Sequence, residues 1–353
     1  HVGFNFLTMK IFRLQLLVSL LSFFAVINSF GQADDADPVT YEELYDEPEN
    51  INRLFLQFQP IIGELYATNP TAGFGIEATY FVKNKMHFNA QTRKAYLDRF
   101  DMMRYNAVRN SDMQNDVEIH NYYQLGFTYH FKDGTESSET KMILYKNSYR
   151  GNRWAARVPL NITIPSKVRK ITGGRLGGYI YDHTIYVNNL LSRQGLSFAD
   201  IKTAEGLTLP EYNVTSPVDS TAIRAFSRMD VAGIYVGGSM SWIRNVAVDI
   251  DKHKPGVDDL IFTAFFDIMV APWIGVENLF YENQEYNIDA LNKSMIGARI
   301  GMDGKFNRTL SWGYGAEMGY RPGLKKGGFF ALVKISLPIY STNLNYTVES
   351  FGK

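Results

Sequence analysis

The chain has 353 residues, with 36 basic and 36 acidic side chains, no cysteine, and an aromatic content of 14%. The lack of cysteine excludes a disulfide framework, thiol catalysis and a cysteine-ligated metal. We expect no nucleic-acid partner.

We predict that residues 1–8 are translated from upstream of the start of the protein at Met9. Residues 9–31 are predicted to be a secretory signal peptide that is cleaved from the protein. Residues 1–8 precede Met9, and a short basic stretch and an apolar run follow it. Small residues stand at Ser29 and Gly31, as a cleavage site requires. The apolar run is too short for a membrane-spanning helix, which needs roughly 20 residues.

Residues 32–52 form an acidic segment, called here the strap, which we expect to be disordered and periplasmic. Its eight carboxylates are Asp34, Asp35, Asp37, Glu42, Glu43, Asp46, Glu47 and Glu49. It has no basic side chain, whereas residues 53–353 carry 34 bases against 28 acids. The strap and the rest of the mature chain are therefore oppositely charged.

Residues 53–340 alternate between apolar and polar side chains with the period of a β-strand. In residues 118–131, for example, odd positions are mostly apolar or aromatic and even positions are mostly polar or small. Such strands, behind a secretion signal, predict an all-β, transmembrane antiparallel β-barrel with a polar lumen. A secreted β-sandwich is the alternative, but it would have shorter strands and outward-facing charges.

We expect fourteen strands, with twelve as the alternative because residues 245–251 and the boundary at Pro272 are weakly marked. The strands are expected at 53–63, 73–83, 86–97, 118–131, 140–149, 153–164, 174–187, 228–242, 245–251, 259–271, 273–282, 294–305, 309–320 and 328–340. An even number places both termini in the periplasm.

The connections predict which end of the barrel faces outward. Residues 83–85, 243–244 and 306–308 are short enough for periplasmic turns. The long connections at 98–117 and 188–227 are expected to be extracellular. The second of these is either a constriction inside the barrel or an exposed binding surface, because loops of this length are usually functional.

The stretch FGIEATYFVKNKMHFNAQTRKAY, with a signal ending in SFGQ and an acidic strap behind it, resembles outer-membrane β-barrel proteins of the Bacteroidota. The resemblance covers residues 9–340 and implies a location in the bacterial outer membrane, in contact with its lipid. It includes no active-site motif, so it transfers no functional residue. Such barrels commonly end on an aromatic residue, whereas residues 341–353 continue here as a C-terminal tail.

The sequence offers little support for catalysis, and we expect no enzyme, no cofactor and no metal. Asp182 and His183 are neighbours in a strand, so their side chains point to opposite faces. His120 and His130 lie too far apart along one strand to share a metal. No HExxH, GxSxG or EF-hand pattern is present.

Charged side chains predicted to face the lumen are the better functional clue. They are Arg153, Arg157, Arg299, Arg321 and Lys334, with Glu77, Asp303 and Glu317 as the opposing acids. Arginines around an open pore would favour anions. The same side chains could instead form salt bridges that fill a closed barrel, since Glu317 and Arg321 share one strand face.

Two main functions therefore remain open. The first is a porin-like, anion-leaning channel for small solutes, gated by the strap folding into the lumen. The second is a non-conducting subunit of an outer-membrane assembly or secretion machine, with the strap or residues 188–227 binding other envelope proteins. The strap could also be a solvated spacer, and an outer-membrane hydrolase is a distant third possibility.

Overall fold

The computed structural model describes residues 39–82, 85–144, 160–216, 219–251 and 253–342. The predicted signal peptide, the first part of the strap with Asp34, Asp35 and Asp37, and the tail beyond residue 342 lie outside the described residues. Arg153 and Arg157 lie outside them as well.

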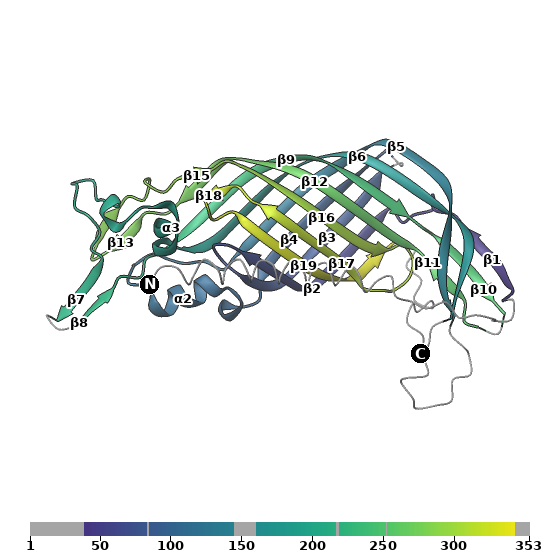
Figure 1. Cartoon of the computed structure of the whole chain (residues 1–353), viewed down its shortest axis with the longest axis horizontal. Helices are drawn as coiled ribbons and strands as arrows, with labels where there is room; N and C mark the ends of the chain where they lie inside the picture. Colours follow the sequence, from purple (N-terminus) through teal and green to yellow (C-terminus); the bar gives the residue numbers. More distant parts are fainter. Residues whose placement is uncertain (1–38, 83–84, 145–159, 217–218, 252, 343–353) are drawn as a thin grey trace, which may run out of the picture.

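Ten antiparallel strands close into one barrel (Figure 1). They are β2 (Leu54–Tyr66), β3 (Thr71–Val82), β4 (Met86–Ala95), β5 (Asn121–Leu144), β6 (Leu160–Tyr186), β9 (Phe226–Ile243), β12 (Leu260–Val276), β16 (Ile296–Phe306), β17 (Gly313–Tyr320) and β19 (Phe329–Ser341). The last strand pairs with the first, so the barrel has no free edge. The predicted all-β barrel is confirmed.

The barrel is apolar outside and polar inside, the reverse of a soluble protein. On β5, Leu125 and Phe131 are 64% and 72% exposed, while Gln124, Thr128 and His130 are buried in the interior. This agrees with the alternation of residues 118–131. An apolar outer wall around fully paired strands suits hydrocarbon, because the bilayer core offers no water to backbone groups.

The strand number differs from the expected twelve to fourteen. β5, β6 and β12 each join two predicted strands, and residues 246–250 form a strand outside the barrel. The polar stretch after Phe131 continues β5 beyond the apolar wall, so the strands expected at 118–131 and 140–149 belong to one strand. At Pro272 the pairing shifts register between Val270 and Trp273, and this irregularity lets one strand contain a proline.

Beyond the barrel, β5 and β6 extend as a paired arm, formed by residues 136–144 and 160–168. β1 (Tyr41–Asp46), β10 (Val246–Ile250) and β11 (Gly256–Asp258) form a three-stranded sheet, the end sheet, next to this arm (Figure 1). Their shared apolar core contains Met142, Leu144, Ile164, Val246, Val248 and Ile250. Residues 41–46 of the strap are thus a paired strand rather than disordered chain.

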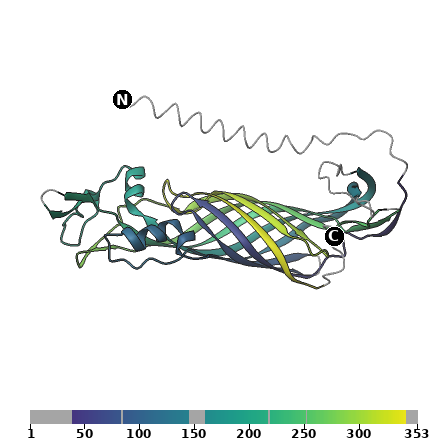
Figure 2. The ribbon, with the colours of Figure 1, turned by 90° about the horizontal axis from the view of Figure 1, so that it is seen from below.

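The opposite end of the barrel carries a folded cap (Figure 2). It contains η2 (Asp98–Phe100), α2 (Met102–Asn110), α3 (Val187–Gln194), η4 (Phe198–Asp200), β7 (Tyr212–Ser216), β8 (Asp219–Ala222), β13 (Leu279–Tyr281), β14 (Gln284–Tyr286), β15 (Lys293–Ser294) and β18 (Gly323–Leu324). Both connections predicted to be extracellular, 98–117 and 188–227, belong to this cap. Leu190 and Leu191 of α3 join one apolar cluster with Tyr66 and Tyr181 of the barrel.

None of the helices in the described part of the chain is both long enough and apolar enough to span a bilayer.

Candidate functional site

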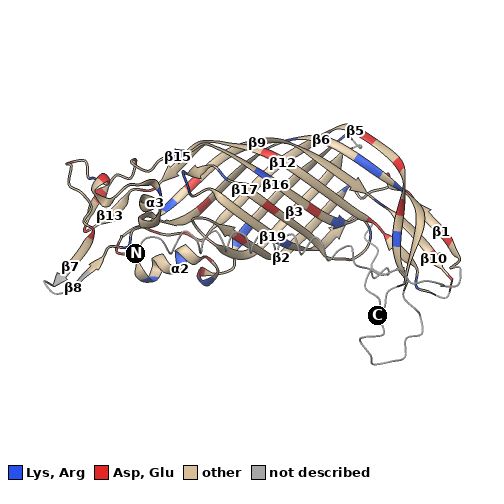
Figure 3. Ribbon diagram, in the orientation of Figure 1, with Lys and Arg blue, Asp and Glu red and all other residues tan. Residues whose placement is uncertain are grey.

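Charged residues lie on most of the barrel strands (Figure 3), and hydrogen bonds and ion pairs join their side chains into one interior network. Its first part joins β6, β12 and β16. Asp267 of β12 accepts from Arg175 Nε at 2.9 Å and from Arg299 Nε, also at 2.9 Å. Arg299 Nη1 also donates to Gln124 Oε1 at 2.7 Å. All of these side chains are buried or nearly so, and Asp267 is fully inaccessible.

Gly237 of β9 makes the contact between Arg175 and Asp267 possible. The register places Gly237 between these two residues on the same inner face. A Cβ atom there would overlap the Phe266 carbonyl oxygen and the Asp267 carboxylate. Glycine therefore leaves the space through which the arginine reaches across a strand to its partner.

Gly237→Val is expected to lower the free energy of unfolding by about 1–3 kcal/mol, as overpacking does. The matched control is Gly238→Val, because a Cβ at Gly238 would meet only the Gly173 carbonyl oxygen at 3.7 Å and faces outward. Urea unfolding of the refolded barrel in detergent measures both. Equal losses for the two variants would show that the space at Gly237 has no special role.

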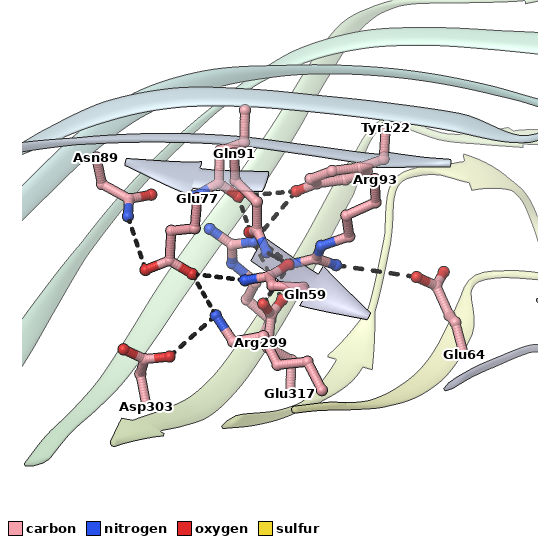
Figure 4. Close-up of polar contacts among 12 residues, drawn as sticks. Gln59, Glu64, Glu77, Asn89, Gln91, Arg93, Tyr122, Arg299, Asp303 and Glu317 are labelled. Atoms are coloured by element: carbon pink, nitrogen blue, oxygen red, sulfur yellow. Dashed lines mark hydrogen bonds and ion pairs between the residues drawn. The ribbon is translucent and has the colours of Figure 1, made fainter. Parts of the chain in front are cut away.

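The second part of the network joins β2, β4 and β17 (Figure 4). Glu317 accepts from Arg93 Nη2 at 2.5 Å and lies 3.4 Å from Arg299 Nη1. Glu64 of β2 binds Arg321, with Nη2 and Oε2 at 3.2 Å. Glu317 and Arg321 share a strand face, as the sequence predicts, but Arg321 forms its ion pair with Glu64 instead.

The third part lies nearer the end sheet and joins β3, β16 and β19. Lys334 Nζ lies 2.6 Å from Glu77 Oε2 and 2.9 Å from Asp303 Oδ1. Lys305 Nζ contacts the same two carboxylates at 3.5 and 3.7 Å. Gln59 donates to Glu77 at 2.9 Å through Nε2 and accepts from Gln91, which in turn accepts from Arg93, so this cluster is linked to the second part of the network (Figure 4).

The structure places six of the predicted lumen charges inside the barrel. They are Arg299, Arg321, Lys334, Glu77, Asp303 and Glu317. Sequence reasoning missed five further members of the network, namely Arg93, Arg175, Lys305, Glu64 and Asp267. With them the network has six bases and five acids, and each acid has an ion-pair partner. Asp267 could have been identified from the sequence as a lumen-facing residue, because it is a lone carboxylate within an apolar strand.

Aromatic rings fill the space around the buried arginines. The Arg321 guanidinium lies 4.0 Å from the centroid of the Phe330 ring, and that of Arg299 lies 4.8 Å from the centroid of Tyr235. Such cation–π contacts stabilise a desolvated cation. Arg299 and Arg321 are only 1% and 0% exposed. The centre of the barrel is therefore closely packed.

A polar cavity of about 70 Å³ remains beside the network, lined among others by Thr263, His87, Arg175 and Asp303. This is room for only a few water molecules. Pockets that take small organic ligands are commonly 300–1,000 Å³.

The described part of the strap, residues 39–52, crosses the barrel end near this cavity, but none of its five carboxylates enters the network. Ile51 packs on the apolar side chains that line this end. Asn245 Nδ2 donates to the Glu47 carbonyl oxygen at 2.8 Å, and Asn307 Nδ2 donates to that of Asn50 at 2.9 Å. Among the described residues, no strap carboxylate forms an ion pair. Burial raises the pKa of Tyr45 in β1, although Arg308 opposes the shift.

The histidines are held in separate contacts. His183 Nε2 lies 2.9 Å from Thr68 Oγ1, whereas Asp182 accepts from Asn121 Nδ2 at 3.1 Å, so the neighbouring Asp182 and His183 diverge. His87 Nδ1 and His130 Nε2 lie 3.0 Å apart. Within the described ranges, no three histidine or acidic side chains are grouped as metal ligands.

No protein-family model and no curated protein matches the sequence. Among solved structures, a TodX deltaS2S3 mutant, a monoaromatic hydrocarbon channel, is 10% identical, with 83% of this chain and 91% of that chain covered and a TM-score of 0.19. In-vitro folded OmpT, an outer membrane protein of Vibrio cholerae, is 11% identical, with 88% and 100% covered and a TM-score of 0.17. TM-scores this low give no information about function. The fold is established by the strand pairing alone.

Proposed function

We propose that the protein is a non-conducting β-barrel of the bacterial outer membrane that anchors a protein-binding sheet at one end. The observation that carries the proposal is the buried interior network, in which every acid is ion-paired across strands. Desolvated ion pairs contribute little net stability, but breaking one leaves a buried charge without its partner. The network therefore fills the lumen, and opening a pore through it would require a large free energy because buried ion pairs would have to break.

The apolar outer wall supports the membrane location. Large apolar side chains are exposed around the barrel strands, including Leu65, Ile234, Ile296 and Val333. In water such a surface would promote aggregation, whereas outer-membrane lipid would cover it. The predicted secretory signal peptide is consistent with export across the inner membrane.

The end sheet supports the binding role. β1 is an edge strand, with β10 as its one neighbour in the described residues. Glu42 of β1 lies directly opposite Asp249 of β10, and both are exposed. Like charges at such a position are mutually destabilising. A basic, extended segment of another envelope protein could pair with the edge and neutralise the carboxylates, with Tyr41 and Leu44 as apolar contacts.

Single-channel recording in a planar bilayer tests the proposal. The refolded protein and a variant lacking residues 32–52 should both give silent bilayers, while a porin in the same bilayer gives steps. Heat-modifiable electrophoretic mobility would first show that both proteins are folded. Anion-selective steps that grow when the strap is removed would contradict the proposal and establish the channel that the sequence alone suggested. No catalytic activity is part of the proposal.

A further inference from the structure

A groove of about 400 Å³ lies outside the barrel, near the cap, between the wall and the η2–α2 segment. Leu65 of β2 and Val333 of β19 form the wall side, and Phe100 and Met102 form the other side. All four side chains are largely exposed, at 67%, 61%, 46% and 53%. The groove is therefore an apolar slot that is continuous with the lipid-facing wall.

Buried polar contacts hold the η2–α2 segment in place. Asp101, which is 0% exposed, accepts from Asn69 Nδ2 at 2.9 Å and from the backbone N–H of Arg104 and His120 at 3.1 and 2.8 Å. It thus caps α2 and ties it to the turn after β2. Met102 N–H also donates to the Pro70 carbonyl oxygen at 3.1 Å. These contacts fix the position of the η2–α2 segment, so the groove is a defined part of the fold.

Arg99 lines this groove and is the one cation of the η2–α2 segment that does so. In the described part of the chain it has no ion pair. Arg104, by contrast, pairs with Asp98, and the Arg109 guanidinium stacks 3.7 Å from the centroid of Tyr105. An apolar slot with one free guanidinium at its side is complementary to an amphiphile with a hydrocarbon chain and a negative headgroup.

We propose that this groove binds one anionic phospholipid of the surrounding membrane. Its acyl chain lies between Leu65 and Val333 on one side and Phe100 and Met102 on the other, and its phosphate contacts Arg99. The volume is in the range of small-molecule sites. The inference rests on the proposed membrane location, but it does not depend on whether the barrel conducts.

Native mass spectrometry of the full-length protein in detergent, with phosphatidylglycerol or phosphatidylcholine added, tests the site. One phosphatidylglycerol should remain bound under conditions that remove phosphatidylcholine. Arg99→Ala should weaken its retention about five- to tenfold, the effect of one charge-assisted contact. Arg109→Ala removes the same charge from the same segment outside the groove and should retain the lipid.

Ala331→Trp fills the groove from the barrel wall and should abolish retention, since Ala331 also lines it. Arg99→Lys, which keeps the charge, should restore most of the binding. Equal losses for Arg99→Ala and Arg109→Ala would overturn the site in favour of general surface attraction, and equal retention of both lipids would overturn headgroup recognition. A dimer that Ala331→Trp dissociates would assign the groove to a second copy of the chain. None of these outcomes would alter the conductance result, so the two proposals fail separately.

Discussion

Arg299→Met is expected to lower the free energy of unfolding of the barrel by about 3–5 kcal/mol, the usual effect of removing one partner from a buried ion pair. Asp267 and Glu317 would each lose a cation, and Gln124 would lose a charged donor. Methionine occupies similar space without charge, so the loss reports mainly the electrostatics. Bulk solvent cannot compensate, because Asp267 is fully buried and Glu317 is only 7% exposed.

The matched control for Arg299→Met is Arg228→Met. Arg228 is also on a barrel strand and contacts two carboxylates, those of Glu118 and Asp230, at 2.7 and 2.8 Å. Its side chain is 31% exposed, so its ion pairs should contribute only about 0–1 kcal/mol. Urea unfolding in lipid vesicles, followed by tryptophan fluorescence, measures both. Similar small losses would show that the interior network is hydrated and that the barrel is not closed as we propose.

The inside and outside of this barrel could be predicted from the sequence because the period of a strand is two. In a regular strand, odd and even positions face opposite sides of the sheet. Glu317 and Lys334 are predicted to face the interior on that basis. The strand number could not be predicted in the same way. Alternation does not show where a strand leaves the membrane, so the polar stretch after Phe131 predicts the end of one strand although β5 continues through it.

The pairing of charges could not be predicted, because it depends on register between strands far apart in sequence. Arg321 and its partner Glu64 are separated by 257 positions, across the closure of the barrel. The alternation of side chains indicates that both residues face inward, but it does not show that they lie at the same level along the barrel axis. Glu64 also lay one residue beyond the expected end of its strand. The surplus of bases that suggested an anion pore falls to one in the observed network, because Glu64 and Asp267 face the lumen as well and every acid is ion-paired.

Val248→Asp is expected to detach the end sheet from the arm while leaving the barrel folded. Val248 is fully buried in the core shared by β10 and the arm, and no basic side chain belongs to that core. A carboxylate there costs several kcal/mol, so amide exchange in β1 and β10 should rise by about a hundredfold or more. Hydrogen exchange with mass spectrometry measures this.

Leu44→Asp adds the same charge at an exposed position of the same sheet and should leave exchange unchanged. If β1 stays protected in Val248→Asp, the end sheet is held by the barrel rather than by its own core. Loss of protection throughout the barrel would instead show that sheet and barrel unfold as one unit, and the end sheet would then be no separate binding element.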